Sequence, residues 1–288
     1  MTIHANISEI NKKQWQQLVD NSPVASFFQT PECYDFYASL SFLEPFVFGI
    51  SENEKLVGLI CGYVIADGGK VKRFFSRRAI ISGGALLDKN ISEEALQILL
   101  KSTINFLKNK AIYIELRNYN DYSKSKIDFE KVGFCYNPHL NFHVSISDVD
   151  SAFSKLNAAK RRAVRLSQKE GTELFEITEM ADLKVFYEIL VNLYKKQIKL
   201  PLFPFEFFEK LKNLSIGRIF GVKYDGRIVG GSVCIFLNKN TVYQWFECGL
   251  DDEYKNIFPS TMANWAVIAY AAENGFSRFD MMGAGKPD

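Results

Sequence analysis

The sequence predicts an α/β protein with mixed sheets, built from two tandem copies of one folding unit. The clearer copy runs from Arg218 to Gly285, where signals for a hairpin, a strand, a helix and a closing strand follow one another. Its hairpin consists of apolar runs at 218–222 and 228–237 on either side of Asp225-Gly226, a dipeptide that supplies the positive φ angles of a tight turn.

The second observation is that the same order of elements occurs once earlier in the chain. Residues 48–58 match residues 220–230 at a constant offset of 172 positions, as Phe48 and Phe220 show, with four identities in eleven positions. Chance similarity between two ordinary hairpins would also give this match. The repeated order of the elements that follow favours a duplication.

Hydrophobic periodicity and turn residues define the elements of the first copy. We expect an edge strand at 3–9, helices at 12–19 and 31–40, a hairpin at 46–65, a strand at 74–85, a helix at 92–108, a closing strand at 112–116, a helix at 127–133 and a last strand at 136–146. These elements predict a first domain over residues 1–150.

The second domain, residues 151–288, is expected to begin with a basic connecting helix at 151–170. A strand at 174–177, helices at 183–196 and 205–211, the hairpin at 218–237, a strand at 241–249, a helix that begins at Pro259 and ends at Gly275, and a closing strand at 278–281 follow. The first unit continues through a helix and a strand after its closing strand. We therefore expect the second unit to lack its C-terminal elements.

Composition excludes several classes of protein. A hydrophobic fraction of 47% with 24% charged residues is typical of a globular chain, and a net charge of +2 makes no general case for DNA binding. Five scattered cysteines without a CxxC pair suggest neither a disulfide framework nor a metal site. The N-terminus has no signal core and no run could span a bilayer, so we expect a cytoplasmic protein without an integral membrane segment, and the sequence carries no cofactor signal.

Cations crowd the connecting helix. Lys160, Arg161, Arg162 and Arg165 stand there without an acidic partner before Glu170. A solvated helix face is the usual meaning of such a run. Like charges at helical spacing repel one another, however, so we favour a phosphate-bearing ligand at this helix.

Two further groups of cations lie in the first domain. Arg77 and Arg78, with Lys72 and Arg73, surround a strand that could hold phosphate or could be a solvated edge, and the two readings carry equal weight. Arg117 directly follows the closing strand, at the end of a sheet where ligands often bind.

The candidate catalytic residues lie in the second domain. Period two along 241–249 would place Tyr243, Trp245 and Glu247 on one face, where Glu247 could bind or deprotonate an amine and the aromatic rings could shape the pocket. A packed aromatic face with Glu247 paired at its rim is the alternative. Asp280, on the closing strand, is a second candidate base or amine anchor, or else a carboxylate that caps the loop after it.

The remaining polar candidates are Lys286, His139 and His143. Lys286 could stabilise an oxyanion or bind a phosphate, although a lysine in this position is more often solvated. His139 and His143 are expected to point the same way from the strand at 136–146. Since no third ligand or nucleophile lies nearby in the sequence, we interpret both histidines as structural.

The predicted order of elements resembles the GNAT acyltransferase fold in tandem, and residues 129–134 resemble the phrase that precedes its sixth strand. Residues 28–31, 160–165 and 279–288 are similar to segments of the Fem family of peptidoglycan bridge-forming aminoacyltransferases, over nearly the whole chain. This resemblance implies transfer of an amino acid from aminoacyl-tRNA to an amine of a lipid- or UDP-linked muramyl peptide.

GNAT enzymes that use acetyl-CoA hold its pyrophosphate on a glycine-rich loop before the long helix. Here that loop begins with Asp251, Asp252 and Glu253 and has no glycine before Pro259. Because carboxylates repel a pyrophosphate, the sequence argues against CoA as the donor. The alternatives that remain are a CoA-dependent N-acyltransferase for a small amine and a non-catalytic module that binds tRNA or a nucleotide-sugar.

Overall fold

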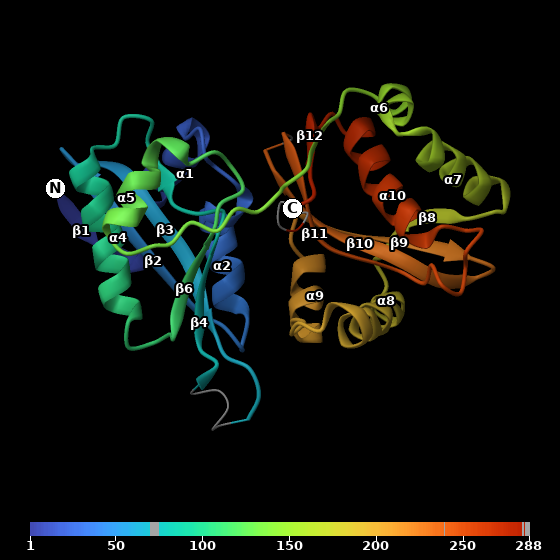
Figure 1. The fold of residues 1–288 in the computed structure, drawn as a ribbon, viewed down its shortest axis with the longest axis horizontal. Coiled ribbons are helices and arrows are strands. Elements are labelled where there is room, and N and C mark those ends of the chain that lie inside the picture. The colour runs from blue at the N-terminus through green and yellow to red at the C-terminus, as the bar shows by residue number, and fades with distance from the viewer. Residues whose placement is uncertain (70–74, 239, 284, 286–288) are drawn as a thin grey trace. The chain divides into compact units, whose positions relative to one another are not determined.

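The computed structural model describes residues 1–69, 75–238, 240–283 and 285 (Figure 1). The chain divides into two compact units, Met1–Pro138 and His139–Asp288. The prediction had placed the boundary at residue 150. The difference arises because residues 143–145 pair with a strand of the second unit.

The first unit is a mixed sheet with helices packed on it. Its strands are ordered β1-β2-β3-β4-β6, and β5 pairs with β3. They are β1 (Thr2–His4), β2 (Glu44–Glu52), β3 (Lys55–Ile65), β4 (Arg78–Ser82), β5 (Leu86–Leu87) and β6 (Tyr113–Arg117). The helices are α1 (Lys12–Asn21), α2 (Pro31–Ser39), α4 (Glu93–Leu107) and α5 (Lys126–Lys131), with short 3₁₀ helices η1 (Ile7–Glu9), η2 (Phe27–Gln29) and η3 (Ser123–Ser125).

The second unit repeats this plan with the strand order β7-β12-β11-β10-β9-β8. Its strands are β7 (His143–Ser145), β8 (Glu173–Glu176), β9 (Gly217–Tyr224), β10 (Arg227–Leu237), β11 (Thr241–Gly249) and β12 (Arg278–Asp280). Its helices are α6 (Val149–Lys155), α7 (Ala158–Lys169), α8 (Met180–Leu193) with the π-helical turn η4 (Tyr194–Ile198), α9 (Phe205–Lys212) and α10 (Pro259–Glu273). Helices α6, α7 and α10 lie on one side of this sheet, and α8 and α9 on the other (Figure 1).

The duplication is confirmed in detail by the two hairpins. Both turns have two central residues at positive φ, Asn53 and Glu54 in the first unit and Asp225 and Gly226 in the second. Both hairpins also carry a register shift at the same place in the repeat, between Ile50 and Ser51 in one and between Ile228 and Gly230 in the other. The equivalent residues that the two shifts leave unpaired, 57 and 229, are both valine.

Side-chain caps explain where several helices begin. Asn11, Thr30, Ser92 and Asn157 each accept a hydrogen bond from a backbone N–H in the first turn of α1, α2, α4 and α7. Proline at the first position starts α10, and Gly275, at a φ of 76°, follows its end.

Three expectations about single elements were wrong. The predicted strand at 136–146 shortens to β7, which pairs with β12 and so fills the place beside the closing strand of the second sheet. The predicted helix at 151–170 is two helices, because Leu156 is extended and Asn157 begins a new helix as its cap. The strand carrying Arg78 is not an edge, since β4 lies between β3 and β6.

Each unit has its own apolar core. In the second unit, α10 packs Met262, Ala266 and Val267 against Val222 and Cys234 of the sheet. Among the helices of the described residues, none is both long and apolar enough to cross a membrane. Within the same residues, no group of histidine, cysteine and carboxylate side chains is arranged to hold a metal ion.

Candidate active site

The second sheet opens where β11 and β12 part. These parallel strands pair only from Thr241 to Tyr243 against Arg278 to Asp280, and β11 then continues beside β10 as far as Gly249. Ligands of α/β sheets bind outside the carboxyl ends of strands, where neighbouring strands diverge. The side chains around Tyr243 and Asp280 are therefore the candidates for a reaction centre.

A β-bulge lies next to this opening. Cys234 pairs with Gln244 and Val233 with Phe246, which leaves Trp245 as an extra residue in β11. Opposed residues of antiparallel strands share a face of the sheet.

The bulge overturns the predicted alternation. Tyr243 opposes Ile235 and Glu247 opposes Ser232, and positions three apart on β10 point to opposite faces. Tyr243 and Glu247 therefore do not line one common face. The bulged Trp245 meets the Phe207 ring of α9 edge to face, with centroids 4.8 Å apart.

Glu247 lies on the face that α10 covers, in a polar cluster. The Gln244 amide donates to Ser232 Oγ at 2.6 Å and to Asn264 Oδ1 at 2.9 Å. Burial raises the pKa of the Glu247 carboxyl, while a hydrogen bond from the Asn264 side chain lowers it. Asp251 raises this pKa further and Lys160 lowers it.

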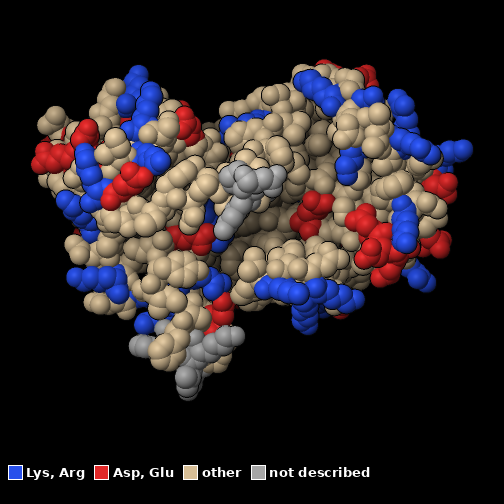
Figure 2. Space-filling view, viewed as in Figure 1, with Lys and Arg blue, Asp and Glu red and all other residues tan. Residues whose placement is uncertain are grey.

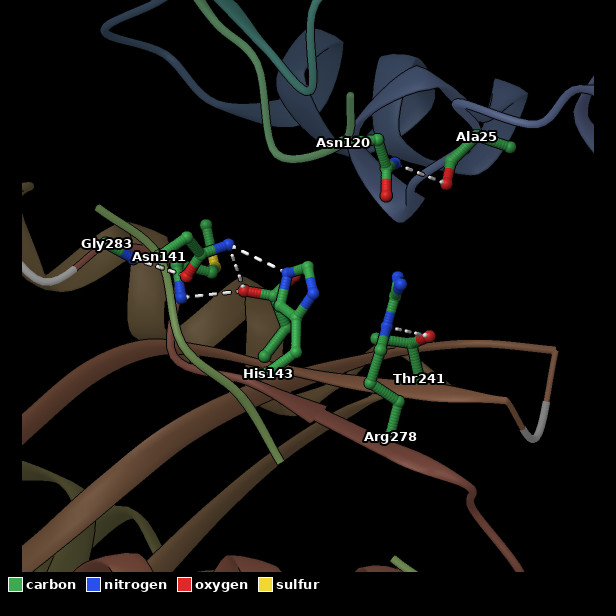
Figure 3. Close-up of polar contacts among 9 residues, drawn as sticks. Ala25, Asn120, Asn141, His143, Thr241, Arg278 and Gly283 are labelled. Atoms are coloured by element: carbon green, nitrogen blue, oxygen red, sulfur yellow. Dashed lines mark hydrogen bonds and ion pairs between the residues drawn. The ribbon is translucent and has the colours of Figure 1, made fainter. Parts of the chain in front are cut away.

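Asp280 is fully buried on the face that carries Tyr243. The Met282 N–H and the Asn141 Nδ2 both donate to its Oδ1, at 2.8 Å and 2.9 Å. His143, its partner on β7, brings Nε2 within 3.0 Å of Oδ2. Figure 3 shows Asn141 and His143 turned toward each other, with the Gly283 backbone beside Asn141.

The two carboxylates predicted as catalytic are thus separated by the sheet. Tyr243 is the parallel neighbour of Asp280, and burial raises the pKa of Tyr243 to about 12, so this phenol stays protonated beside the carboxylate at neutral pH. Asp280 has a histidine within ion-pair distance, whereas Glu247 is held under α10 by an amide.

Comparisons with known proteins agree with this architecture. Residues 154–287 match the family model described as "Acetyltransferase (GNAT) domain". The solved structure of FemX superposes with a TM-score of 0.72 at 16% identity and covers 100% of this chain and 90% of that one. The tandem GNAT protein from the clavulanic acid biosynthesis pathway gives a TM-score of 0.63 at 10% identity, with 100% and 90% covered. The chain has a tandem GNAT fold.

A further structural neighbour of this tandem GNAT chain is L-PGS from Bacillus licheniformis, at a TM-score of 0.53 and 12% identity, with 96% of this chain and 77% of that one covered. A comparison with curated protein sequences gives no match. The predicted fold class and the Fem-like tandem GNAT architecture are confirmed. The structural neighbours show the fold, and the family model that matches residues 154–287 is described as an acetyltransferase domain.

In the second GNAT unit, a carboxylate occupies the N-terminus of the long helix. The Ser260 N–H donates to Asp251 Oδ1 at 3.2 Å, and the Ser260 hydroxyl donates to Oδ2. Free N–H groups and the helix dipole at this end attract anions. Asp251 already supplies the negative charge there.

The equivalent helix of the first GNAT unit begins in a similar way. Ser92 caps α4, and its hydroxyl donates to Glu52 Oε1 at 2.5 Å. Glu93 and Glu94 then stand in the first turn of the helix. Both helix starts therefore carry carboxylates.

The predicted cations of α7 point several ways. Arg161 donates to the backbone carbonyls of Ser154 and Leu156, and Arg165 lies over the Phe153 ring at 5.1 Å from its centroid. Lys160 donates to Thr261 of α10 at 2.9 Å, and Arg162 is exposed. Figure 2 shows Lys and Arg side chains gathered over the end of the second unit where α6 and α7 lie.

In the first unit, two of the predicted cations have carboxylate partners. Arg78 forms a two-pronged contact with Asp67, at 2.5 Å and 3.3 Å, and Arg117 Nε donates to Glu115 at 2.8 Å. Arg77 lies just before β4. Lys72 and Arg73 lie outside the described residues, as does Lys286.

The Gln29 side chain fills the break after β4. Its Nε2 donates to the carbonyls of Gly83 and Gly84 and to the Tyr122 hydroxyl, at 3.0, 3.2 and 3.1 Å. A Cβ at Gly84 would lie 2.2 Å from Asn118 Oδ1. This part of the resemblance segment at 28–31 therefore holds the fold together.

Sequence reasoning missed His143 and Asn141. The spacing Asn-x-His places both on one side of an extended segment, which was a usable signal. Their shared partner, Asp280, lies at the other end of the unit's sequence. Only the pairing of β7 with β12 brings these three residues together.

Proposed function

We propose that the chain is an aminoacyltransferase that moves an amino acid from aminoacyl-tRNA to an amine of a peptidoglycan precursor stem peptide, carried by a lipid- or UDP-linked muramyl peptide, in the cytoplasm. The comparisons support the coarser statement, an acyltransferase of GNAT fold. The finer statement rests on the choice of donor and on the groups that would meet the acceptor.

The observation that carries the choice of donor is Asp251 at the start of α10. In a CoA-dependent GNAT unit this helix end would receive a pyrophosphate. Here the Ser260 N–H donates to a carboxylate instead. A diphosphate at this end would meet a fixed negative charge and would have to displace that hydrogen bond. An ester donor without a diphosphate arm avoids both costs.

The acceptor amine would meet the opening between β11 and β12. Attack on an ester needs an amine that has lost its proton, and a carboxylate held without water nearby can orient the ammonium first. We propose Asp280 for this part of the site. Glu247 lies on the other face, under α10, and we assign it to holding the polar cluster there.

The diphosphate of a muramyl-peptide carrier would meet the cations of α7. We propose Arg162 and Arg165, both exposed, and Lys160 at the α10 end of the helix as its contacts. Arg161, which caps α6 through two carbonyls, contributes charge to the same surface. Arg77, Arg78 and Arg117 belong to the first unit, and substrate binding there stays a separate prediction.

The second candidate is CoA-dependent N-acylation of an amine. It is favoured by the full-length match to the tandem GNAT protein of the clavulanic acid pathway, whose printed name mentions AcCoA. A third possibility is a lipid as the acceptor, because the name of another structural neighbour, a putative lysylphosphatidylglycerol synthetase, contains a phospholipid.

The test is product formation with a matrix of donors and acceptors. Aminoacyl-tRNAs and acetyl-CoA are each incubated with UDP-muramyl pentapeptide, with a lipid-linked muramyl peptide and with phosphatidylglycerol, and products are identified by mass spectrometry. We expect an aminoacyl mass increase on a muramyl peptide. Acetylated product alone would establish the second candidate, and aminoacylated phosphatidylglycerol alone would establish the third.

A further inference from the structure

We propose that His143 is the proton acceptor of the transfer reaction and that Asp280 positions it. This inference deepens the proposed function, because it names the base that acts on the acceptor amine. It also reverses the interpretation of His143 as structural. It rests on two features: the carboxylate oxygen of Asp280 that, among the described residues, only His143 approaches, and the unequal exposure of the two partners.

The carboxylate of Asp280 directs only one oxygen toward His143. Oδ1 accepts from the Met282 N–H at 2.8 Å and from Asn141 Nδ2 at 2.9 Å. Oδ2 has no aligned hydrogen bond within the described part of the chain, and His143 Nε2 lies 3.0 Å from it.

Nε2 of His143 lies 3.0 Å from two groups, Oδ2 of Asp280 and Nδ2 of Asn141. The Gly283 N–H donates to Asn141 Oδ1 at 3.0 Å, so the Nδ2 end of Asn141 faces Asp280 and His143. If Nε2 were the unprotonated nitrogen, Oδ2 of a fully buried carboxylate would have no donor, which is costly. A proton on Nε2 gives this carboxylate its donor but leaves the N–H of Asn141 that faces Nε2 without an acceptor. The charged, buried carboxylate is the stronger acceptor of the two contacts, so we place the proton on Nε2 and the lone pair on Nδ1.

The exposure of the pair suits proton transfer to a bound substrate. The Asp280 side chain is 0% exposed, whereas the His143 side chain is 38% exposed. A buried carboxylate that orients a partly exposed imidazole stabilises the imidazolium that forms when Nδ1 takes a proton. Asp280 acts on the amine through the His143 ring in this arrangement, so its proposed part in orienting the ammonium is exerted through that ring.

Within the described residues, the polar and charged groups near His143 come from β11, β12 and α6. On β12, Arg278 donates from Nε to Thr241 Oγ1 at 3.2 Å, and on β11 Tyr243 is the neighbour of Asp280. From α6, Lys155 Nζ lies 3.4 Å from the Ser145 carbonyl at the end of β7. Asp280 is the carboxylate paired with the ring.

Atoms and charge balance in the proposed transfer. The acceptor ammonium gives one proton to Nδ1 of His143, and the free amine attacks the ester carbonyl. The nitrogen–carbon bond forms and the carbon–oxygen bond of the ester breaks. The imidazolium returns its proton to the departing ribose oxygen, and the second proton lost by the nitrogen goes to solvent, so His143 ends as it began.

The kinetic test compares His143→Gln with the matched control His139→Gln. The glutamine amide can still donate to Asp280 Oδ2 but cannot accept a proton, so the fold is kept while the base is lost. His139 is exposed and lies before β7. We expect His143→Gln to lower kcat by about 100-fold or more and to remove the acidic limb of the pH profile of kcat. His139→Gln should leave both unchanged, and an equal pH profile in His143→Gln would overturn the proposal.

A spectroscopic test decides the same point without any activity. The chain has three histidines, so ¹⁵N-histidine labelling gives three ring spectra that the two variants assign. We expect His143 to show a protonated Nε2 and an unprotonated Nδ1 at neutral pH, and Asp280→Asn to abolish that preference. A protonated Nδ1 in the intact protein would overturn the proposal. Absence of transfer with every donor, together with the expected tautomer, would instead refute the proposed function alone.

Discussion

Replacing Gln29 by alanine should lower the free energy of unfolding of the first unit by more than the loss of one side chain of this size suggests. Gln29 is fully buried, and its Oε1 accepts from the Ser26 N–H at 2.7 Å while its Nε2 reaches the Gly84 carbonyl at 3.2 Å. With alanine at position 29, the Ser26 N–H and the Gly84 carbonyl both lose this hydrogen-bond partner. Each buried polar group left without a partner costs about 1–3 kcal/mol, so we expect a loss of about 4 kcal/mol in the free energy of unfolding.

The assay is urea denaturation followed by the fluorescence of Trp15. This residue is buried beside the substitution, and its Nε1 donates to the Gln29 backbone carbonyl at 2.7 Å, a bond that alanine keeps. Since Trp245 and Trp265 belong to the second unit, both are replaced by phenylalanine in the background used for all measurements.

The matched control is Gln17→Ala, an exposed position on α1, which should change the free energy by less than about 0.5 kcal/mol. A loss below about 1 kcal/mol for Gln29→Ala would refute the assignment of this side chain as the bridge that holds the break after β4.

Three further predictions follow from the structure. Glu247→Gln should stabilise the protein at neutral pH, because burial raises the pKa of the Glu247 carboxyl. The stability that the protonated carboxyl gives is complete below about pH 4.5 and is lost as the pH rises through the raised pKa. The gain from glutamine should therefore disappear in acid, when the free energy of unfolding is measured against pH. Gly84→Ala should lower the free energy of unfolding by about 2–4 kcal/mol, since Gly84 has a φ of 80° and a Cβ there would lie 2.2 Å from Asn118 Oδ1. Gly69→Ala, where a Cβ would have nothing within 4 Å, should leave thermal unfolding nearly unchanged. Arg161→Ala should lower the free energy of unfolding by about 1 kcal/mol, because the cap on α6 is lost. Arg162→Ala should leave the free energy of unfolding intact and weaken the binding of a UDP-muramyl peptide, measured by calorimetry. Equal effects of the two substitutions on stability would contradict the different contacts of the two arginines.

Local signals made the hairpins and the long helices predictable. Asp225-Gly226 and Asn53 set their turns by their own φ preferences, and Ser92 and Pro259 mark helix starts through caps that act within one turn. Such features need no knowledge of distant residues, which is why the tandem plan could be read from the sequence.

The arrangement of the candidate site could not be predicted in the same way. The bulge at Trp245 depends on how β10 and β11 pair, and it separates Tyr243 from Glu247 in spite of their spacing. The pairing of β7 with β12 joins His143 to Asp280 across most of the second unit's sequence. Register and strand order are set by tertiary packing, and period two alone does not report them.

The most direct measurement of the proposed chemistry is a competition between donors in one reaction. The protein is given equal concentrations of aminoacyl-tRNA and acetyl-CoA with a muramyl pentapeptide acceptor, and the products are separated by mass. The carboxylate at the start of α10 predicts an aminoacylated peptide as the product and no acetylated peptide. An acetylated peptide as the main product would contradict the account.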